Sequence, residues 1–238
     1  MIRFVKDDYI RLVEYISSYS MAEPSAESDA SIKKIHRACL AALQVWSVVS
    51  GKIAGDGVII GSGYLNDDLP GSAWIGEFFS DLVSSAFSSF HGLYKPAHMT
   101  LRSSIEVLLR ACAGVASEEA LATTSIFRLF DICRGDAAFA GLAAKHLDKL
   151  HACYSDLCKF THTATQAHMA KTYAFANYPS TNPAQLNVFS EKFYAVIVSG
   201  LSVLVINDKS LYLNVPPRAR DLLEMILPAD VRLSALGQ

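Results

Sequence analysis

Two stretches of the chain place side chains that can transfer protons beside strongly apolar helix faces. The first carries Arg102 and Glu106 four positions apart, and the second carries Tyr154 and His162. At about 100° per residue, apolar side chains fill one sector of the first stretch, with Arg102 at its edge. Tyr154 and His162 share one stripe of the second stretch. Helices packed along these faces would bring together a guanidinium, a carboxylate, a phenol and an imidazole, which suits general acid–base chemistry.

The same four side chains also fit a purely structural role. A charge away from water is costly unless it is paired, so a buried Arg102 or His162 needs a partner. Glu106 can hold Arg102, or it can orient His162 and favour its charged form. The pattern therefore indicates either a catalytic group or a polar clasp between two core helices, because structural ion-pair networks also perturb titratable groups.

Histidines and cysteines in the second stretch invite comparison with a zinc site. The candidate ligands are His151, Cys153, Cys158 and His162. On one continuous helix Cys153 points about 200° away from His151, so the four cannot surround one ion. The chain has no His-Glu-x-x-His or Gly-x-Ser-x-Gly motif, and we expect no metal and no cofactor. The spacing allows a Cys158–His162 nucleophile pair, although a buried structural cysteine is commoner.

Composition predicts a cytoplasmic protein with a large core. Hydrophobic residues make up 51% of the 238 residues and charged residues 18%, which excludes a disordered chain. The net charge of -2 argues against a nucleic-acid footprint over the whole surface but permits a local basic groove. An odd count of five cysteines in apolar helical patterns is typical of reduced thiols. The N-terminus predicts no signal peptide, and the longest apolar run, 193–206, is shorter than the roughly 20 residues that span a bilayer.

The elements that must position these side chains are all predicted to be helices. Apolar residues recur at helical spacing along most of the chain, and no internal repeat is visible. We expect a single all-α domain over residues 1–238, a bundle of about seven or eight helices. The predicted helices cover residues 3–20, about 32–50, 74–90, about 97–112, 118–133, 136–162, 183–206 and 216–227.

A glycine-rich loop over residues 51–72 is predicted to follow the second helix. Its Gly55-Asp56-Gly57 run lacks the third glycine of a dinucleotide-binding loop and the Gly-Lys-Ser/Thr ending of a P-loop. A surface loop or lid is therefore the better interpretation, with room for one short strand at residues 58–60.

The spacing of the polar residues resembles that of a known group of proteins. Arg102-x-x-x-Glu106 on one helix, with Tyr154 and His162 near the end of a later one, is similar to the divergent HEPN-like all-helical families. These families include uncharacterised and abortive-infection-type bacterial proteins. The resemblance covers roughly residues 74–206.

The resemblance implies both a function and a site. Active members of the group cut RNA without metal, often across a dimer interface, with a histidine that an arginine precedes at a short spacing. By this resemblance His162 would be the acid/base histidine of a metal-independent endoribonuclease. The chain would then be a homodimer in a bacterial phage-defence or stress-response system. Its partners would be RNA and a protein of a defence or toxin–antitoxin operon.

The chain departs from the family pattern at the arginine. Residues 155–157, where that arginine should stand, are Ser, Asp and Leu, and Lys159 is the basic residue nearby. RNA cleavage needs a base for the 2'-hydroxyl, an acid for the leaving oxygen and a cation for the phosphorane charge. Arg102 or Arg110 on the neighbouring helix would have to supply the cation. Two other functions stay open: a non-catalytic interaction module, and a small-molecule or nucleotide sensor with its pocket under the glycine-rich loop.

Overall fold

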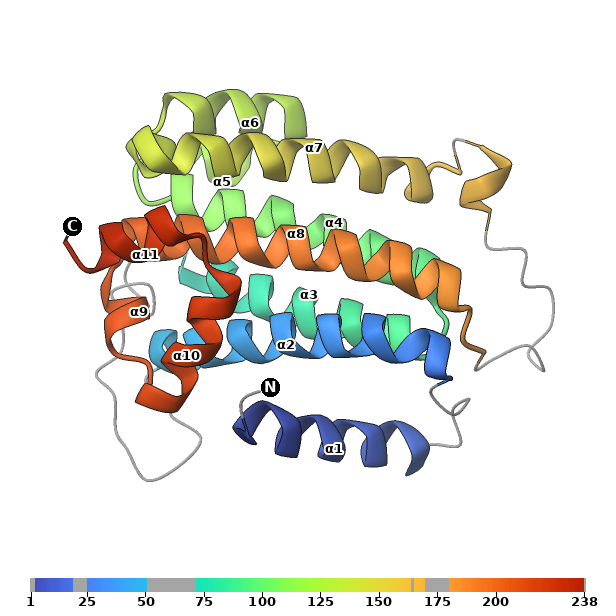
Figure 1. The fold of residues 1–238 in the computed structure, drawn as a ribbon. Helices are drawn as coiled ribbons and strands as arrows, with labels where there is room; N and C mark the ends of the chain where they lie inside the picture. Colours follow the sequence, from blue (N-terminus) through green and yellow to red (C-terminus); the bar gives the residue numbers. More distant parts are fainter. Residues whose placement is uncertain (1–2, 19–24, 51–71, 164, 170–179, 238) are drawn as a thin grey trace.

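The computed structural model describes residues 3–18, 25–50, 72–163, 165–169 and 180–237. Within these ranges the chain is helical apart from its turns and has no β-strand, which confirms the predicted all-α class (Figure 1). The α-helices are α1 (Arg3–Ser18), α2 (Ala26–Val49), α3 (Ser72–Phe90), α4 (Tyr94–Ala113), α5 (Glu118–Ala122), α6 (Ile126–Gly135), α7 (Ala144–Thr161), α8 (Pro183–Asn207), α9 (Ser210–Leu213), α10 (Pro217–Ile226) and α11 (Ala229–Ala235). The 3-10 helices of the described part are η2 (Ala137–Phe139), η3 (Gly141–Ala143) and η4 (Gln166–His168).

The apolar helix α8 lies at the centre of the bundle (Figure 1). It packs against α2, α4 and α7, and it also contacts α3 and α11. α3 lies along α4, and α6 packs on both α4 and α7. α1 lies beside α2 at one edge, while α9, α10 and α11 gather at one end of the bundle (Figure 1). Five long helices therefore enclose one continuous apolar core, and the shorter elements cover its edges.

The sequence of α8 explains its central place. The helix is apolar almost all round, and such a helix belongs either in a protein core or in a membrane. It is the one helix of the described residues that is long and apolar enough to span a bilayer, but 67% of its most apolar window is buried inside the protein. Asn182 caps its start by accepting a hydrogen bond from the Gln185 N–H at 3.1 Å, and Pro183 follows at the first turn, as predicted. α8 is therefore a core helix of the kind found in soluble proteins.

Two glycines are required where elements approach closely. Gly200 lies within α8, where a Cβ would come within 2.9 Å of Phe78 Cζ on α3 and 3.1 Å of a Leu108 methyl on α4. Its missing side chain lets three core helices approach, against a cost of about 1 kcal/mol in helix propensity relative to alanine. Gly92 joins α3 to α4 with a φ of +72°, and a Cβ there would overlap the backbone of Ser180.

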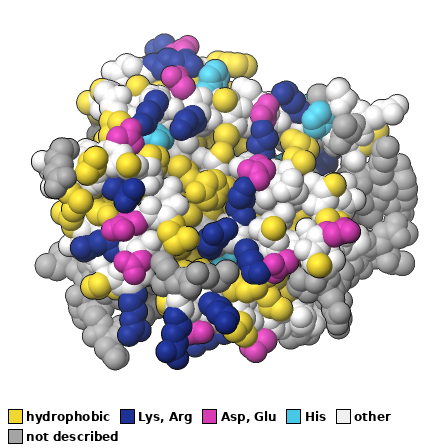
Figure 2. Space-filling view, in the orientation of Figure 1, with side chains coloured by type: hydrophobic (Ala, Val, Ile, Leu, Met, Phe, Trp, Pro, Cys, Tyr) yellow, Lys and Arg dark blue, Asp and Glu magenta, His cyan; other side chains and the backbone are white. Residues whose placement is uncertain are grey.

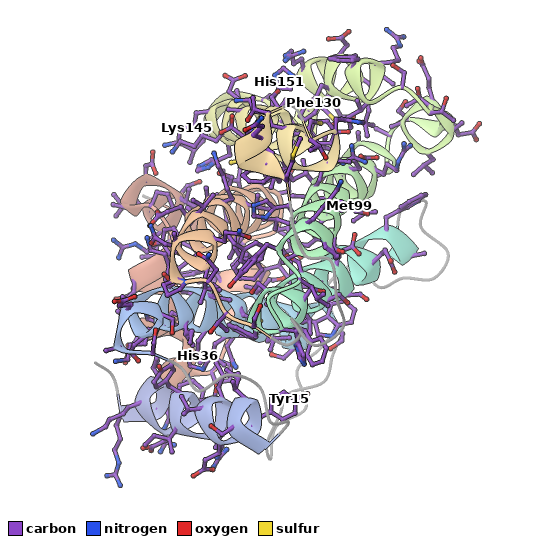
Figure 3. All side chains as sticks on the ribbon, turned by 90° about the vertical axis from the view of Figure 1, so that its right-hand side faces the viewer. Tyr15, His36, Met99, Phe130, Lys145 and His151 are labelled. Carbon is purple, nitrogen blue, oxygen red and sulfur yellow. The ribbon has the colours of Figure 1, made fainter. Side chains whose placement is uncertain are left out.

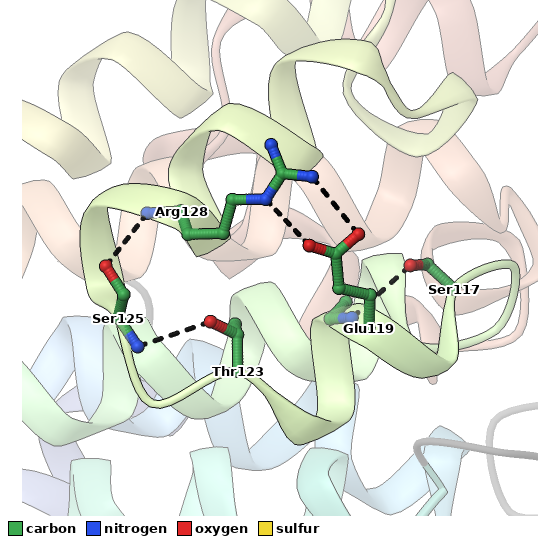
Figure 4. Close-up of polar contacts among 6 residues, drawn as sticks. Ser117, Glu119, Thr123, Ser125 and Arg128 are labelled. Atoms are coloured by element: carbon green, nitrogen blue, oxygen red, sulfur yellow. Dashed lines mark hydrogen bonds and ion pairs between the residues drawn. The ribbon is translucent and has the colours of Figure 1, made fainter.

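The helix predicted to follow Ser117 is in fact two helices, α5 and α6 (Figure 4). The hydroxyl of Ser117 caps α5 as predicted, and the hydroxyl of Ser125 caps α6 in the same way. Between them the Thr123 hydroxyl accepts a hydrogen bond from the Ser125 N–H at 3.2 Å. Short polar side chains here compete with the helical backbone and end α5. Arg128 then joins the two helices through a bidentate pair with Glu119, at 2.7 and 3.2 Å.

The described residues hold eleven α-helices, more than the seven or eight predicted, because one predicted helix is divided into α5 and α6 and because α9 and α11 were not predicted. The start of α7 also differs from the prediction. Asp136 does not cap the long helix, because its carboxylate accepts a hydrogen bond from the Ala138 N–H at 2.8 Å and caps η2 instead. Gly141, with a φ of +57°, opens η3, and α7 begins only at Ala144. Beyond the last predicted helix, α11 forms near the C-terminus and buries Val231 completely.

The predicted glycine-rich loop over residues 51–72 lies outside the described residues, apart from Ser72 at the start of α3. The strand suggested at residues 58–60 and the Gly55–Gly57 run lie outside them as well.

Polar contacts hold α1 on α2. His36 Nε2 lies 2.7 Å from Asp8 Oδ2, and the Tyr9 hydroxyl donates a hydrogen bond to Asp29. His36 lies on the face of α2 that is turned toward α1 (Figure 3). The Tyr9 ring meets the His36 ring edge-on at a centroid distance of 5.7 Å. These contacts fix the position of α1 at the edge of the bundle.

Stability should depend on pH through His146. Its side chain in α7 is 0% exposed, and neither ring nitrogen has a hydrogen-bond partner. Burial lowers the pKa of His146 to about 4, against about 6.5 in an unfolded chain. Between these two values the unfolded state binds more protons than the folded state. The free energy of unfolding should therefore fall as the pH drops from about 6.5 to about 4.

We expect His146→Leu, which keeps a similar volume without polar nitrogens, to raise stability at pH 5 and to weaken this pH dependence. Each unit of pKa difference corresponds to about 1.4 kcal/mol. Urea unfolding at pH 7 and pH 5 measures the effect, with the partly exposed His91→Gln as control. Some dependence should persist, because burial also lowers the pKa of His98 to about 4. A His146→Leu variant with the full wild-type pH dependence would contradict the assignment.

Candidate functional site

The two helices that carry the predicted site residues lie side by side and run in opposite directions. Tyr154 of α7 contacts Glu106 of α4, whereas Thr163, just after α7, contacts Lys95 near the start of α4. The polar residues on each helix are spaced four apart and therefore share one face. Antiparallel packing brings these two faces together, so the site lies along the seam between α4 and α7.

Three of the four predicted residues meet in this seam. The Tyr154 hydroxyl donates a hydrogen bond to Glu106 Oε1 at 3.0 Å, and Arg102 Nε lies 3.8 Å from the same oxygen. The Arg102 guanidinium lies over the Tyr154 ring at 5.5 Å from its centroid. Arg102 Nη1 also donates to the Cys158 thiol at 3.9 Å. We call Arg102, Glu106, Tyr154 and Cys158 the α4–α7 cluster.

Within the cluster, one nitrogen of the Arg102 guanidinium has no hydrogen-bond acceptor. Burial raises the pKa of Tyr154, and the Glu106 carboxylate raises it further, so the phenol stays protonated and keeps donating. Arg102 Nε is buried without a hydrogen-bond partner, because 3.8 Å to the carboxylate is too long for one. The side chains of Arg102 and Glu106 are 25% and 28% exposed, so the guanidinium lies at the boundary with solvent.

His162 does not join the cluster. It lies at the C-terminal cap of α7, where its N–H donates to the Cys158 carbonyl at 2.9 Å, and its side chain is exposed. Within the described residues its ring contacts none of Arg102, Glu106 and Tyr154. It does share the stripe of Tyr154 and Cys158, and it follows Cys158 by about one helical turn, roughly 5–6 Å along the axis. The predicted end of this helix, at residue 162, agrees to within one residue with the end of α7 at Thr161.

Arg110, the second candidate for the missing cation, has another role. Its guanidinium donates to the backbone carbonyls of Ala120, Leu121 and Thr123 at 2.7–3.2 Å. It thereby satisfies carbonyls that the short helix α5 leaves without intrahelical partners. Arg110 also lies over the Trp74 ring at 5.4 Å. The structure therefore ties Arg110 to the α4–α5 connection, and Arg102 is the arginine at the seam.

A residue that sequence reasoning missed is Asp81 of α3. Its side chain is almost completely buried against α4, and Oδ2 has no hydrogen-bond partner. Burial raises the pKa of Asp81, a hydrogen bond from Ser103 opposes this rise, and the charge of Glu106 adds to it. Sequence reasoning assigned no role to Asp81, because this residue lies among the aromatic residues of an apolar helix face. A single acidic residue in such a stripe is the signal that would have identified it.

No metal centre forms among the described residues, where no group of three or more histidine, cysteine or acidic side chains converges. All five cysteines are free. His151 packs against Phe130 at a centroid distance of 4.4 Å, and its Nδ1 lies 3.3 Å from an Arg134 nitrogen (Figure 3). Cys153 is buried on the other side of α7. The two candidate ligands thus diverge, as their helical spacing predicts.

Comparison of the chain with protein-family models, with curated proteins and with solved structures gives no match. The HEPN-like resemblance therefore stays a prediction from the residue pattern.

Removing the hydroxyl of Tyr154 should test the central contact of the cluster. We expect Tyr154→Phe to lower the free energy of unfolding by about 0.5–1.5 kcal/mol, because the aromatic contact with Arg102 survives and one hydrogen bond is lost. A double-mutant cycle with Glu106→Gln isolates the pairwise energy. Tyr194→Phe on α8 is the matched control, since Tyr194 contributes a ring contact to Lys34. Equal effects of the two tyrosine variants would show that the hydrogen bond contributes nothing.

Proposed function

We propose that this chain is a HEPN-like helical protein of a bacterial defence or stress-response system, and that it cleaves RNA without metal at the seam between α4 and α7. The observation that carries the proposal is the placement of Arg102. Its guanidinium lies over the Tyr154 ring and near the Glu106 carboxylate, and its side chain is 25% exposed, so the positive charge lies at the boundary with solvent. The exposed imidazole of His162 follows on the same stripe of α7.

In this proposal each residue has a separate chemical task. His162 removes the proton of the 2'-hydroxyl, whose oxygen attacks the neighbouring phosphorus. The bond to the 5' oxygen then breaks as that oxygen takes up the proton from the His162 imidazolium. Arg102 stabilises the negative charge that develops on the phosphorane. Tyr154 is a protonated phenol, and Glu106 positions both Tyr154 and Arg102. Arg102 thus takes the role of the arginine that is absent from residues 155–157.

The distribution of surface charge favours a local nucleic-acid site over an extended one. Lys and Arg side chains alternate with Asp and Glu over the face of the molecule in Figure 2, without a continuous basic surface. Non-specific binding along a duplex needs many basic contacts in a row. A short single-stranded segment needs fewer contacts, and a guanidinium beside an aromatic ring suits it.

A non-catalytic interaction module is the second candidate, and a specific observation favours it. Arg102, Glu106 and Tyr154 contact one another, while within the described part of the chain the imidazole of His162 makes no hydrogen bond or ring contact with any of them. A clasp between two core helices needs only those three residues. The two candidates differ in what His162 does, so substitution of His162 separates them.

Incubation of total RNA with the protein in EDTA tests the catalytic proposal. We expect the wild type to cleave and His162→Ala to lose about 10²–10⁴-fold in rate while its thermal melt stays unchanged, because His162 is exposed. Arg102→Gln should also lose cleavage, with some loss of stability. His91→Ala, a histidine in the turn after α3, is the matched control. Failure of the wild type to cleave, or full activity of His162→Ala, would leave the clasp as the function of the cluster.

We also propose that the protein is a homodimer. Large apolar side chains are exposed on separate helices, among them Met99 on α4 and Phe127 on α6, the latter 75% exposed. Met99 lies one turn before Arg102 and Ser103, on the helix that carries the proposed site (Figure 3). Light scattering at micromolar concentration should give twice the chain mass. A monomer at that concentration would exclude a site that depends on a partner subunit.

A further inference from the structure

A concave site lies at one end of the α4–α7 seam, away from the cluster. It is a pocket of about 330 Å³ between the first turn of α4, the end of α7 and the first turns of α8. Its walls include Lys95, His98, Phe160, His168, Met169 and Val188. Pockets for small molecules begin at about 300 Å³ and are mostly apolar with a few placed polar groups. This pocket has both properties.

His98 is the most informative residue of the pocket. Its side chain is 2% exposed, and Nδ1 is buried without a hydrogen-bond partner. Its ring meets Phe160 edge-on at a centroid distance of 3.9 Å and stacks on Phe189 at 5.5 Å. Packing on both sides fixes the imidazole where it lines the pocket. A buried polar nitrogen without a partner is rare in native proteins, and a polar group of a bound ligand can supply that partner.

The charged side chains of the pocket indicate the sign of the charge that a ligand should carry. Apart from the Tyr94 phenol, each ionisable side chain among the described lining residues is basic: Lys95, His98 and His168. The Lys95 ammonium donates to the Thr163 hydroxyl at 3.0 Å, which holds it at the pocket and leaves further hydrogens to donate. Burial keeps His98 neutral at pH 7, so its ring can donate or accept a hydrogen bond without adding charge. The net positive field favours a single negative charge.

The remaining walls select the body of the ligand. Phe160 presents its ring to both His98 and His168, at centroid distances of 3.9 and 4.8 Å. Met169 and Val188 are 44% and 42% exposed, which is high for apolar side chains and leaves them free to cover a ligand. Aromatic faces and a thioether bind flat rings well.

We propose that this pocket is a binding site for a compact aromatic carboxylate, with the carboxylate at Lys95 and the ring between Phe160, Met169 and Val188. This function goes beyond RNA cleavage and does not depend on it, because the pocket and the α4–α7 cluster share no residue.

Three probes with one ring and different charge test the ligand class: indole-3-acetate, indole-3-acetamide and tryptamine. Isothermal titration calorimetry should show that indole-3-acetate binds and that indole-3-acetamide binds at least about tenfold more weakly, because the amide loses a charge-assisted hydrogen bond. Tryptamine, which is positively charged, should not bind. Equal binding of the acetate and the acetamide would overturn the assignment of Lys95. The absence of indole-3-acetate binding at millimolar concentration would overturn the site.

Variants at exposed or partly exposed positions locate the binding without threatening the fold. Lys95→Met should weaken indole-3-acetate about tenfold or more and change indole-3-acetamide little. Val188→Trp should fill the pocket and abolish binding of both, while Lys209→Met, an exposed lysine beyond α8, should change neither. The imidazole nitrogen resonances of His98 should shift on adding indole-3-acetate to the wild type but not to Val188→Trp. Unchanged binding in Val188→Trp would place the ligand elsewhere and refute the proposal.

Discussion

Enclosure of α8 is the constraint on which the rest of the structure depends. Exposure of any face of this almost wholly apolar helix to water is unfavourable. The helices α2, α3, α4 and α7 therefore surround it. Gly200 makes this enclosure tight, because it lets Phe78 and Leu108 approach the α8 backbone. While α4 turns its leucine and isoleucine face toward α8, Arg102 and Glu106 lie along its seam with α7, and Ser103 lies along its seam with α3.

Those seams are among the places where buried polar atoms lack hydrogen-bond partners, as they also do at His36 and His146. Buried polar atoms without partners occur at Asp81 on α3 and at His98 and Arg102 on α4, all within the same part of the bundle. Each such atom costs free energy that a neutral apolar side chain would not. Nearby, the Tyr154 hydroxyl donates a hydrogen bond to Glu106, so the spacing of α4 and α7 does allow polar side chains to pair. Three side chains on two neighbouring helices thus have buried atoms without hydrogen-bond partners, which is a physical reason to look for ligands here.

The cluster and the pocket divide the α4–α7 seam between them. The cluster lies toward its middle, where a fixed guanidinium meets solvent, and the pocket lies at its end, where α7 stops and the chain turns at Thr163 with a φ of 51°. His162 follows the pocket residue Phe160 by two positions and directly precedes Thr163, whose hydroxyl accepts a hydrogen bond from Lys95. The antiparallel pair of α4 and α7 thus carries the charged cluster, and together with the start of α8 and residues 168–169 it encloses the pocket.

The sequence alone determined the helical class, the buried centre and the faces of the polar residues. Periodicity places Arg102, Tyr154 and His162 on the correct stripes because side-chain direction in a helix is local geometry. It cannot show that the backbone carbonyls of α5 use Arg110, since that depends on a contact between separate segments. Only the register between α4 and α7 brings Tyr154 to Glu106. The same packing leaves His98 Nδ1 without a hydrogen-bond partner and forms the pocket beside it. Register follows from packing of the whole core around α8, which no local pattern records.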